Sequence, residues 1–150
     1  PDNPYIMNNL GVAYRHTHQY GKARTNYNAA KDKGIDERNN LGILDIKVAK
    51  YSSATNSFEE NRCDYNVALA YTLNEDYDKA LDKIECITTK SADVFYLRAI
   101  IAARQGDEEL MTTSLRRAVE KNSAIREWAK DDLEFRDYKG TQEFKNALRY

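Results

Sequence analysis

Residues 8–14, with the sequence NNLGVAY, decide the fold, because close variants of this stretch return twice further along the chain. The first return is NNLGIL at residues 39–44, and the second is YNVALAY at residues 65–71. A phrase that recurs in this way indicates a protein built from repeated structural units.

The first unit predicts two antiparallel helices. Asn3 and Pro4 suit a helix start, with Asn at the N-cap and Pro at the first helical position. Apolar and small residues then recur every three or four positions, which is the spacing of one helical face. They are Met7, Leu10, Gly11 and Tyr14, and, after a break, Ala23, Tyr27 and Ala30. Gly34 is placed to end the second helix.

The spacing of the recurring positions supports four such units. The step from the Leu position to the Ala position of each unit is thirteen residues: 10 to 23, 41 to 54, 67 to 80 and 98 to 111. The steps between successive Leu positions are 31, 26 and 31 residues. A constant step inside each unit is what a packed helix pair requires. The short step of 26 residues from the second to the third repeat predicts that the second helix of the second repeat, over residues 53–61, is shorter than usual.

The repeated pattern resembles the tetratricopeptide repeat (TPR), in which a large residue, Leu-Gly, Tyr, Ala and an aromatic residue recur on two antiparallel helices. The first unit follows this pattern from Met7 to Ala30, while Arg38, Asp45, Arg98 and Glu108 stand where other residue types are expected. The resemblance implies an all-α solenoid of helix pairs in a right-handed superhelix. We expect repeats over residues 4–34, 35–60, 61–91 and 92–121.

The last part of the chain, residues 122–150, is predicted to cap the repeats, since a repeat array must cover its final apolar face. We expect a capping helix and a short final helix here. Their apolar positions are Ile125, Trp128, Ala129, Leu133, Phe135, Tyr138, Phe144 and Leu148. No linker divides the chain, so we expect one domain over residues 1–150.

The resemblance also implies that a protein or peptide partner binds a groove lined by the first helix of each pair. The residues of this predicted groove are Asn8, Val12, Asn39, Ile43, Lys47, Arg62, Tyr65, Leu69, Tyr96, Ile100 and Arg104. Apolar residues along the middle with charges at the rim suit a partner segment with apolar anchors. The alternative is that these residues pack against neighbouring repeats or the C-terminal helix.

The sequence offers no catalytic, cofactor-binding or metal-binding motif. His16 and His18 are two residues apart on a predicted helix and so diverge. Cys63 and Cys86 would lie on the two helices of one hairpin and could meet, but the separation of their Cα atoms cannot be taken from the sequence. Two small buried core residues are the favoured interpretation.

Net charge and hydropathy argue against two further classes of protein, those that bind nucleic acid and those that span a membrane. The formal net charge is −1, which argues against nucleic acid as a partner, and no apolar run approaches the length that a membrane helix needs. The start at Pro1 suggests a segment of a longer protein. Residues 128–135 (WAKDDLEF) resemble TPR arrays of Gram-negative cell-envelope proteins, which implies a periplasmic or cell-envelope location. We expect a non-catalytic interaction module without cofactors. The alternative is a structural spacer or self-association element, whose groove holds its own chain or a second copy.

Overall fold

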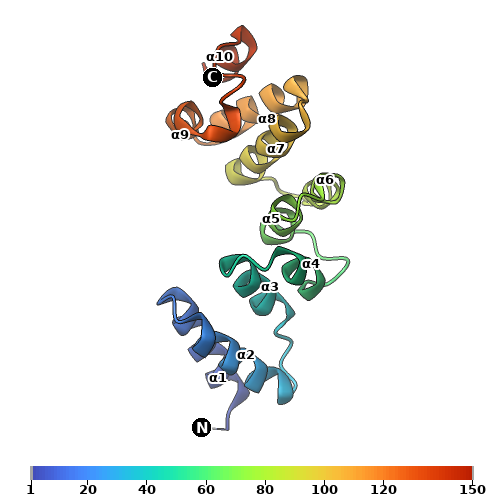
Figure 1. Ribbon diagram of the computed structural model, residues 1–150, viewed down its shortest axis with the longest axis vertical. Coiled ribbons are helices and arrows are strands. Elements are labelled where there is room, and N and C mark those ends of the chain that lie inside the picture. Colours follow the sequence, from blue (N-terminus) through green and yellow to red (C-terminus); the bar gives the residue numbers. More distant parts are fainter. Residues whose placement is uncertain (1, 150) are drawn as a thin grey trace. The chain divides into compact units, whose positions relative to one another are not determined.

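The computed structural model describes residues 2–149, and within them the chain is all-helical, with no strand (Figure 1). The helices are α1 (Pro4–His16), α2 (Tyr20–Asp32), α3 (Arg38–Lys47), α4 (Tyr51–Ser57), α5 (Tyr65–Leu73), α6 (Tyr77–Glu85), α7 (Ala92–Gln105), α8 (Glu108–Lys121), α9 (Ile125–Asp131), the 3-10 helix η1 (Leu133–Phe135) and α10 (Gln142–Ala147). The prediction of an all-α fold is confirmed. No helix in the described part is both long and apolar enough to cross a membrane.

The chain divides into two compact bodies, each larger than a single repeat, which we call unit 1 and unit 2 from here on. Unit 1 (Pro1–Arg62) contains α1 to α4, and unit 2 (Cys63–Tyr150) contains α5 to α10. Inside the units the first eight helices pack as neighbouring pairs: α1 with α2, α3 with α4, α5 with α6, and α7 with α8. The uniform composition of the chain gave no sign of this division.

The four pairs share one turn geometry. The turn between the two helices of each pair contains one residue with a positive φ: His18, Ala49, Glu75 and Gly106. These residues are 31, 26 and 31 positions apart, the same steps that separate the Leu positions. In every pair the next amide donates to a carbonyl five residues back, at 2.8–3.0 Å. The hairpins are therefore repeats in backbone geometry as well as in sequence.

A glycine lets the two helices of each pair in unit 1 approach closely. A Cβ atom on Gly11 would lie 2.5 Å from Cε1 of Tyr27, and one on Gly42 would lie 2.6 Å from Cζ of Phe58. Both aromatic rings are buried, so neither has free space to move into. This explains why Gly occurs at this place in the first two repeats.

The second helix of the second pair is short, as the sequence predicts. α4 has seven residues, whereas α2 has thirteen. It covers residues 51–57, so it starts and ends before the predicted 53–61, and Phe58 follows in an extended conformation.

Three of the charged residues that depart from the repeat pattern form ion pairs: Arg38, whose network is described below, Asp45 and Arg98. Asp45 is buried, pairs with Arg24 and accepts a hydrogen bond from Ser57 Oγ at 3.3 Å. Arg98 Nη2 lies 2.7 Å from Glu85 Oε1. A charge in place of Tyr or Leu is accommodated at these positions because a partner of opposite sign lies beside it.

The C-terminal residues pack on the last helix pair, with α9 and α10 against α8 and η1 against α7. Ile125, Ala129, Phe135, Phe144 and Leu148 are buried as expected. The sequence was wrong about two other apolar positions of this segment. Trp128 is 53% exposed because only one side of the short helix α9 meets the core, where Ile125 and Ala129 are buried. Leu133 is 78% exposed because it lies in η1, whose buried residue is Phe135.

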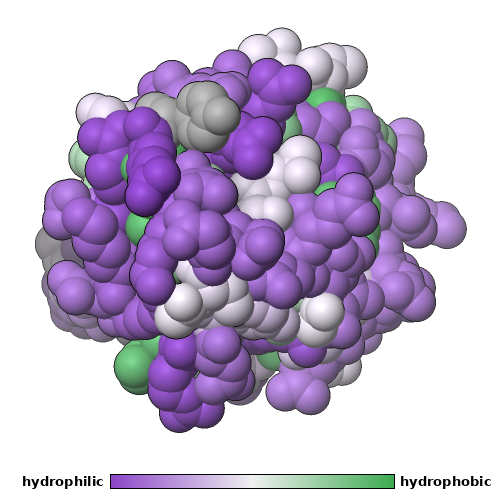
Figure 2. Space-filling model, turned by 90° about the horizontal axis from the view of Figure 1, so that it is seen from above, coloured by the Kyte–Doolittle hydropathy of each residue, from purple (hydrophilic) through white to green (hydrophobic). Residues whose placement is uncertain are grey.

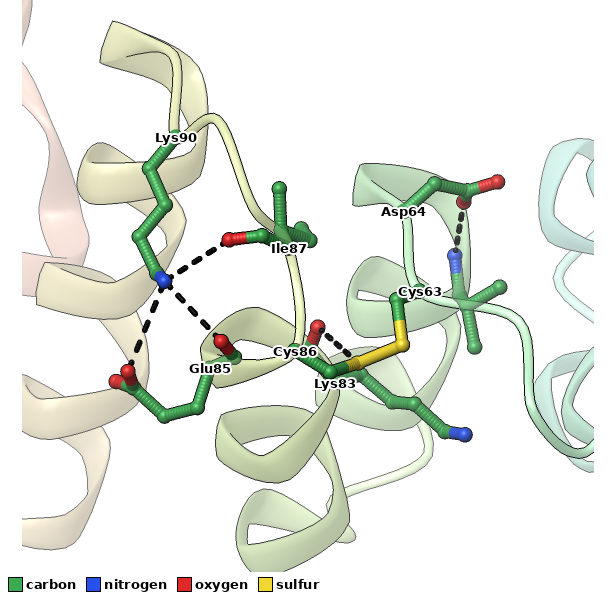
Figure 3. The surroundings of a disulfide bond; sticks show 8 residues. Cys63, Asp64, Lys83, Glu85, Cys86, Ile87 and Lys90 are labelled. Atoms are coloured by element: carbon green, nitrogen blue, oxygen red, sulfur yellow. Dashed lines mark hydrogen bonds and ion pairs between the residues drawn. A yellow bond between two sulfur atoms is a disulfide. The ribbon is translucent and has the colours of Figure 1, made fainter.

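The interpretation of the cysteines as buried and unbonded is wrong. Cys63 and Cys86 form a disulfide, with Cα atoms 5.7 Å apart, and both residues are exposed (Figure 3). Cys63 lies just before α5, and Cys86 is the C-cap of α6. The start of the first helix and the end of the second lie together in an antiparallel hairpin, so the bond closes the open end of this pair.

Candidate interaction surface

In unit 1 the predicted groove residues of α1 and α3 lie on neighbouring helices. Asn40 Nδ2 of α3 donates to Asn8 Oδ1 of α1 at 2.8 Å. Val12 packs against the core cluster of Ala23, Tyr27 and Leu44. Asn39 and Ile43 are half-buried and Lys47 is exposed. The structure thus brings the first helices of the two pairs together along this face.

A buried carboxyl lies beneath this contact. Glu37, only 1% exposed, accepts a hydrogen bond from Asn40 Nδ2 at 2.8 Å through Oε2. Its Oε1 has no hydrogen-bond partner among the described residues. Burial raises the pKa of Glu37, and the hydrogen bond from Asn40 opposes this shift. Nothing in the repeat pattern marks Glu37, so the sequence did not identify it.

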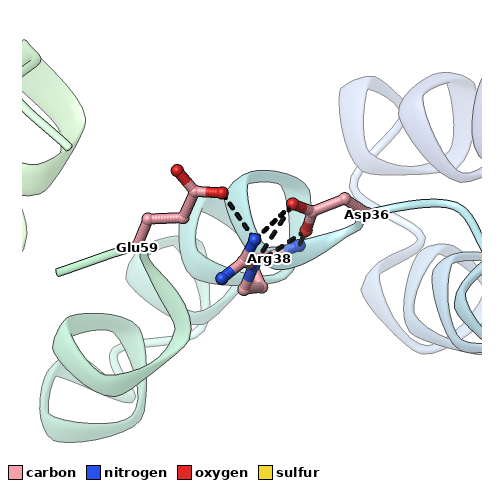
Figure 4. A network of polar contacts seen from close by, with 3 residues as sticks. All are labelled: Asp36, Arg38 and Glu59. Carbon is pink, nitrogen blue, oxygen red and sulfur yellow. Dashed lines mark hydrogen bonds and ion pairs between the residues drawn. The ribbon is translucent and has the colours of Figure 1, made fainter. Parts of the chain in front are cut away.

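Arg62 lies beside a surface ion network that joins the start of α3 to Glu59, which follows α4. Arg38 donates to Asp36 Oδ1 at 3.0 Å through Nε and also pairs with Glu59 (Figure 4). The hydrogen bonds from Arg38 hold the pKa of Asp36 well below its usual range. These residues, with Asn39 and Arg62, line a polar pocket of about 110 Å³. Its size and its charge balance suit an exposed structural network.

In unit 2 the predicted groove residues of α5 differ in exposure. Tyr65 is 37% exposed, whereas Leu69 packs against the core cluster around Ala68, Ala80 and Ile84. Burial, with the nearby charge of Asp93, raises the pKa of the Tyr65 hydroxyl.

The groove residues of α7 contact the C-terminal part of the chain. Tyr96 donates its hydroxyl hydrogen to Asp132 Oδ2 at 2.7 Å, and its ring meets the Phe135 ring edge to face, with centroids 5.7 Å apart. Burial and the bond to Asp132 raise the pKa of Tyr96. Arg104 pairs with Glu134, its Nε lying 2.9 Å from Oε2. Ile100 packs on the same C-terminal core cluster.

The segment of residues 132–135 therefore fills the α7 end of the predicted groove. This is the packing alternative that the sequence left open. Phe135 is fully buried, so this residue of the segment belongs to the core of unit 2.

A second surface was missed by the sequence analysis. We define the α1 face as Tyr5, Ile6, Leu10 and Ala13, which are all exposed. Tyr5, Ile6 and Leu10 are 67%, 51% and 44% exposed, and they are three of the six large hydrophobic side chains exposed in the described part. Leu10 was expected in the core stripe. It is exposed because no helix of unit 1 packs on this side of α1. The equivalent Leu41 of α3 packs against Ala23, Tyr27 and Leu44, which come from α2 and α3.

The other three exposed large hydrophobic residues of the described part lie on three different elements: Tyr65 on α5, Trp128 on α9 and Leu133 on η1. Figure 2 shows one face of the molecule, covered mainly by hydrophilic residues, with hydrophobic ones appearing as small separate spots. Small isolated spots are ordinary on a folded protein, whereas contiguous apolar patches mark interaction sites. The α1 face differs from such spots, because its exposed apolar residues all lie on one helix.

The described residues contain no group of three or more His, Cys, Asp or Glu side chains that could hold a metal ion. His18 lies in the turn after α1, where its Nδ1 is hydrogen-bonded to the Tyr20 hydroxyl at 2.8 Å.

Comparison with known proteins does not narrow the function. No protein-family model matches the chain, and a search of curated proteins finds no significant relative.

Proposed function

We propose that this chain is a TPR-like module, with its helix pairs in a right-handed superhelix, that binds a protein or peptide partner and catalyses no reaction. The observation that carries the proposal is the exposed apolar α1 face. Exposed apolar side chains gathered on one helix are typical of a surface that another polypeptide covers. Tyr5, Ile6 and Leu10 of α1 are such side chains, which supports a role in docking.

The partner would also follow the predicted groove in unit 1. The hydrogen bond between Asn40 and Asn8 joins α1 to α3, so a segment anchored on Tyr5 can continue toward Asn39 and Lys47. Aromatic and aliphatic anchors with polar groups at the rim are typical of interfaces. A partner segment with two or three apolar anchors and an acidic end, to meet Lys47, fits this surface.

The disulfide supports a location outside the cytoplasm. Such bonds persist in oxidising compartments, including the bacterial periplasm, and Cys63–Cys86 is exposed to any reductant. This agrees with the proposed cell-envelope location.

A second candidate function is a structural spacer whose groove holds its own chain. The contacts of Tyr96 and Arg104 with Asp132 and Glu134 favour it. They concern only α7, and they leave the α1 face unused.

A peptide-display selection on the folded chain tests the leading proposal. Recovered peptides are titrated by calorimetry against the natural chain, against Ile6→Glu/Leu10→Glu, and against the control Thr25→Glu/Asn28→Glu, whose residues are exposed on α2. We expect peptides with apolar anchors whose affinity falls at least tenfold, by roughly 1.4 kcal/mol or more, in the α1 variant only. Selected peptides that bind the α1 variant with unchanged affinity would refute the proposal.

A further inference from the structure

Between α9 and α10, unit 2 has a pocket of about 470 Å³, which is within the size range of small-molecule sites. Two apolar side chains, Phe144 and Leu148, form part of its lining. The remaining lining residues are all cationic: Arg126, Lys130, Lys139, Lys145 and Arg149. None of the described residues that line it carries a carboxylate.

The cations of this pocket are only partly compensated. Lys130 pairs with Glu127 at 2.7 Å. Lys145 and Arg126 donate to backbone carbonyls, those of Gly140 at 2.8 Å and Leu148 at 2.6 Å. The carbonyl of Gly140 satisfies a hydrogen bond of Lys145 and leaves its positive charge in place. Like charges that converge on one pocket repel each other, and an anion in the pocket relieves that repulsion.

The apolar part of the lining selects among anions. A fully hydrated inorganic ion gains nothing from Phe144 and Leu148, whereas an alkyl chain gains from contact with them and with the methylene stems of the lysines. The convergence of the charges on one pocket suits a single anionic group.

We propose that this pocket binds an amphiphilic anion, with the anionic group held by Lys139, Lys145 and Arg149 and a short alkyl chain on Phe144 and Leu148. Such a ligand can come from a free fatty acid or from an anionic lipid in a bilayer. The site is separate from the α1 face and does not depend on the proposed partner binding.

Calorimetric titration of the whole chain with octanoate at low ionic strength tests the pocket. Octanol tests the alkyl chain without the charge, and inorganic phosphate tests the charge without the alkyl chain. We expect octanoate to bind at least tenfold more tightly than either. We also expect Lys139→Gln/Lys145→Gln to weaken octanoate binding at least tenfold.

The control variant Arg117→Gln/Lys121→Gln removes two positive charges from α8 residues that do not line the pocket. We expect it to change octanoate affinity less than twofold. Far-UV circular dichroism and thermal unfolding establish that both variants stay folded, which is expected because the side chains they change are not buried.

Sedimentation with vesicles distinguishes the two sources. Binding to phosphatidylglycerol vesicles, lost in the pocket variant and absent with phosphatidylcholine, assigns the site to bilayer lipid. Octanoate binding without vesicle binding assigns it to a free amphiphile. The proposal is overturned if neither octanoate nor anionic vesicles bind, if phosphate binds as tightly as octanoate, or if the two double variants weaken binding equally.

Discussion

Adding a single methyl group at Gly11 tests the close helix approach that defines each pair. The new Cβ of Gly11→Ala would lie 2.5 Å from the ring of Tyr27. Because Tyr27 is fully buried, relief requires the two helices to separate. Overpacking of this kind costs about 1–3 kcal/mol, and the better helix propensity of Ala returns about 1 kcal/mol. We expect a net loss of about 1 kcal/mol, within a range of about 0–2 kcal/mol, and the same for Gly42→Ala, which meets Phe58.

Gly21 provides a matched control inside the same unit. It lies on α2, where an added Cβ meets nothing within 4 Å. Gly21→Ala should therefore stabilise the chain by about 0.5–1 kcal/mol through helix propensity alone. Urea denaturation followed by far-UV circular dichroism measures all three variants. If Gly11→Ala were as stabilising as Gly21→Ala, the close-packing account would be refuted.

Three further predictions concern the turns, the disulfide and the buried carboxyl. Ala49→Gly should stabilise by about 0.5–1 kcal/mol, and Gly106→Ala should destabilise by a similar amount, because both positions have a positive φ; thermal unfolding of the pair should show shifts of opposite sign. Reducing the Cys63–Cys86 bond, which spans 23 residues, should lower the stability of unit 2 by about 3 kcal/mol; the fluorescence of the single tryptophan reports this unit, and an unchanged midpoint would contradict the expectation. Burial raises the pKa of Glu37, so its contribution to stability is present below the unfolded pKa and is lost as the pH rises through the folded pKa. Glu37→Gln should then stabilise the chain at pH 7 by about 1 kcal/mol and give little or no gain near pH 4. Urea titrations at both pH values measure this, and equal effects at the two pH values would show that desolvation of the charge is not the cause.

The sequence predicted the helix pairs well because their signals are local and recur. The caps and stripes depend on residues three or four positions apart, and the thirteen-residue step fixed which positions face each other. The N-cap at Asn3, the left-handed Gly34 after α2 and the short α4 all follow from such signals, and the structure confirms them.

The errors arose where exposure depends on what covers a helix from outside its own pair. Leu10 and Leu41 occupy the same place in the repeat, yet only Leu41 packs on a preceding helix. The disulfide was missed because both cysteines lie just outside the helices, where the periodic pattern ends. A signal was present in principle, since those two places are adjacent in any antiparallel hairpin.

The contacts of the C-terminal segment could not have been foreseen from periodicity. The hydrogen-bonded residues Tyr96 and Asp132 are 36 positions apart, and Arg104 and Glu134 are 30 positions apart. No repeat spacing relates the two members of either pair. Partner binding by the remaining groove residues stays a prediction.

The most direct test of the central claim is light scattering of the purified chain over a range of concentrations, alone and with Ile6→Glu/Leu10→Glu. Three partly exposed side chains offer much less than the roughly 800 Å² per partner of a stable dimer. We therefore predict a 17.3 kDa monomer in both cases, with the α1 face free for a different protein. A dimer that the two substitutions dissolve would show that this face serves self-association, and the proposal of a partner-binding module would fall.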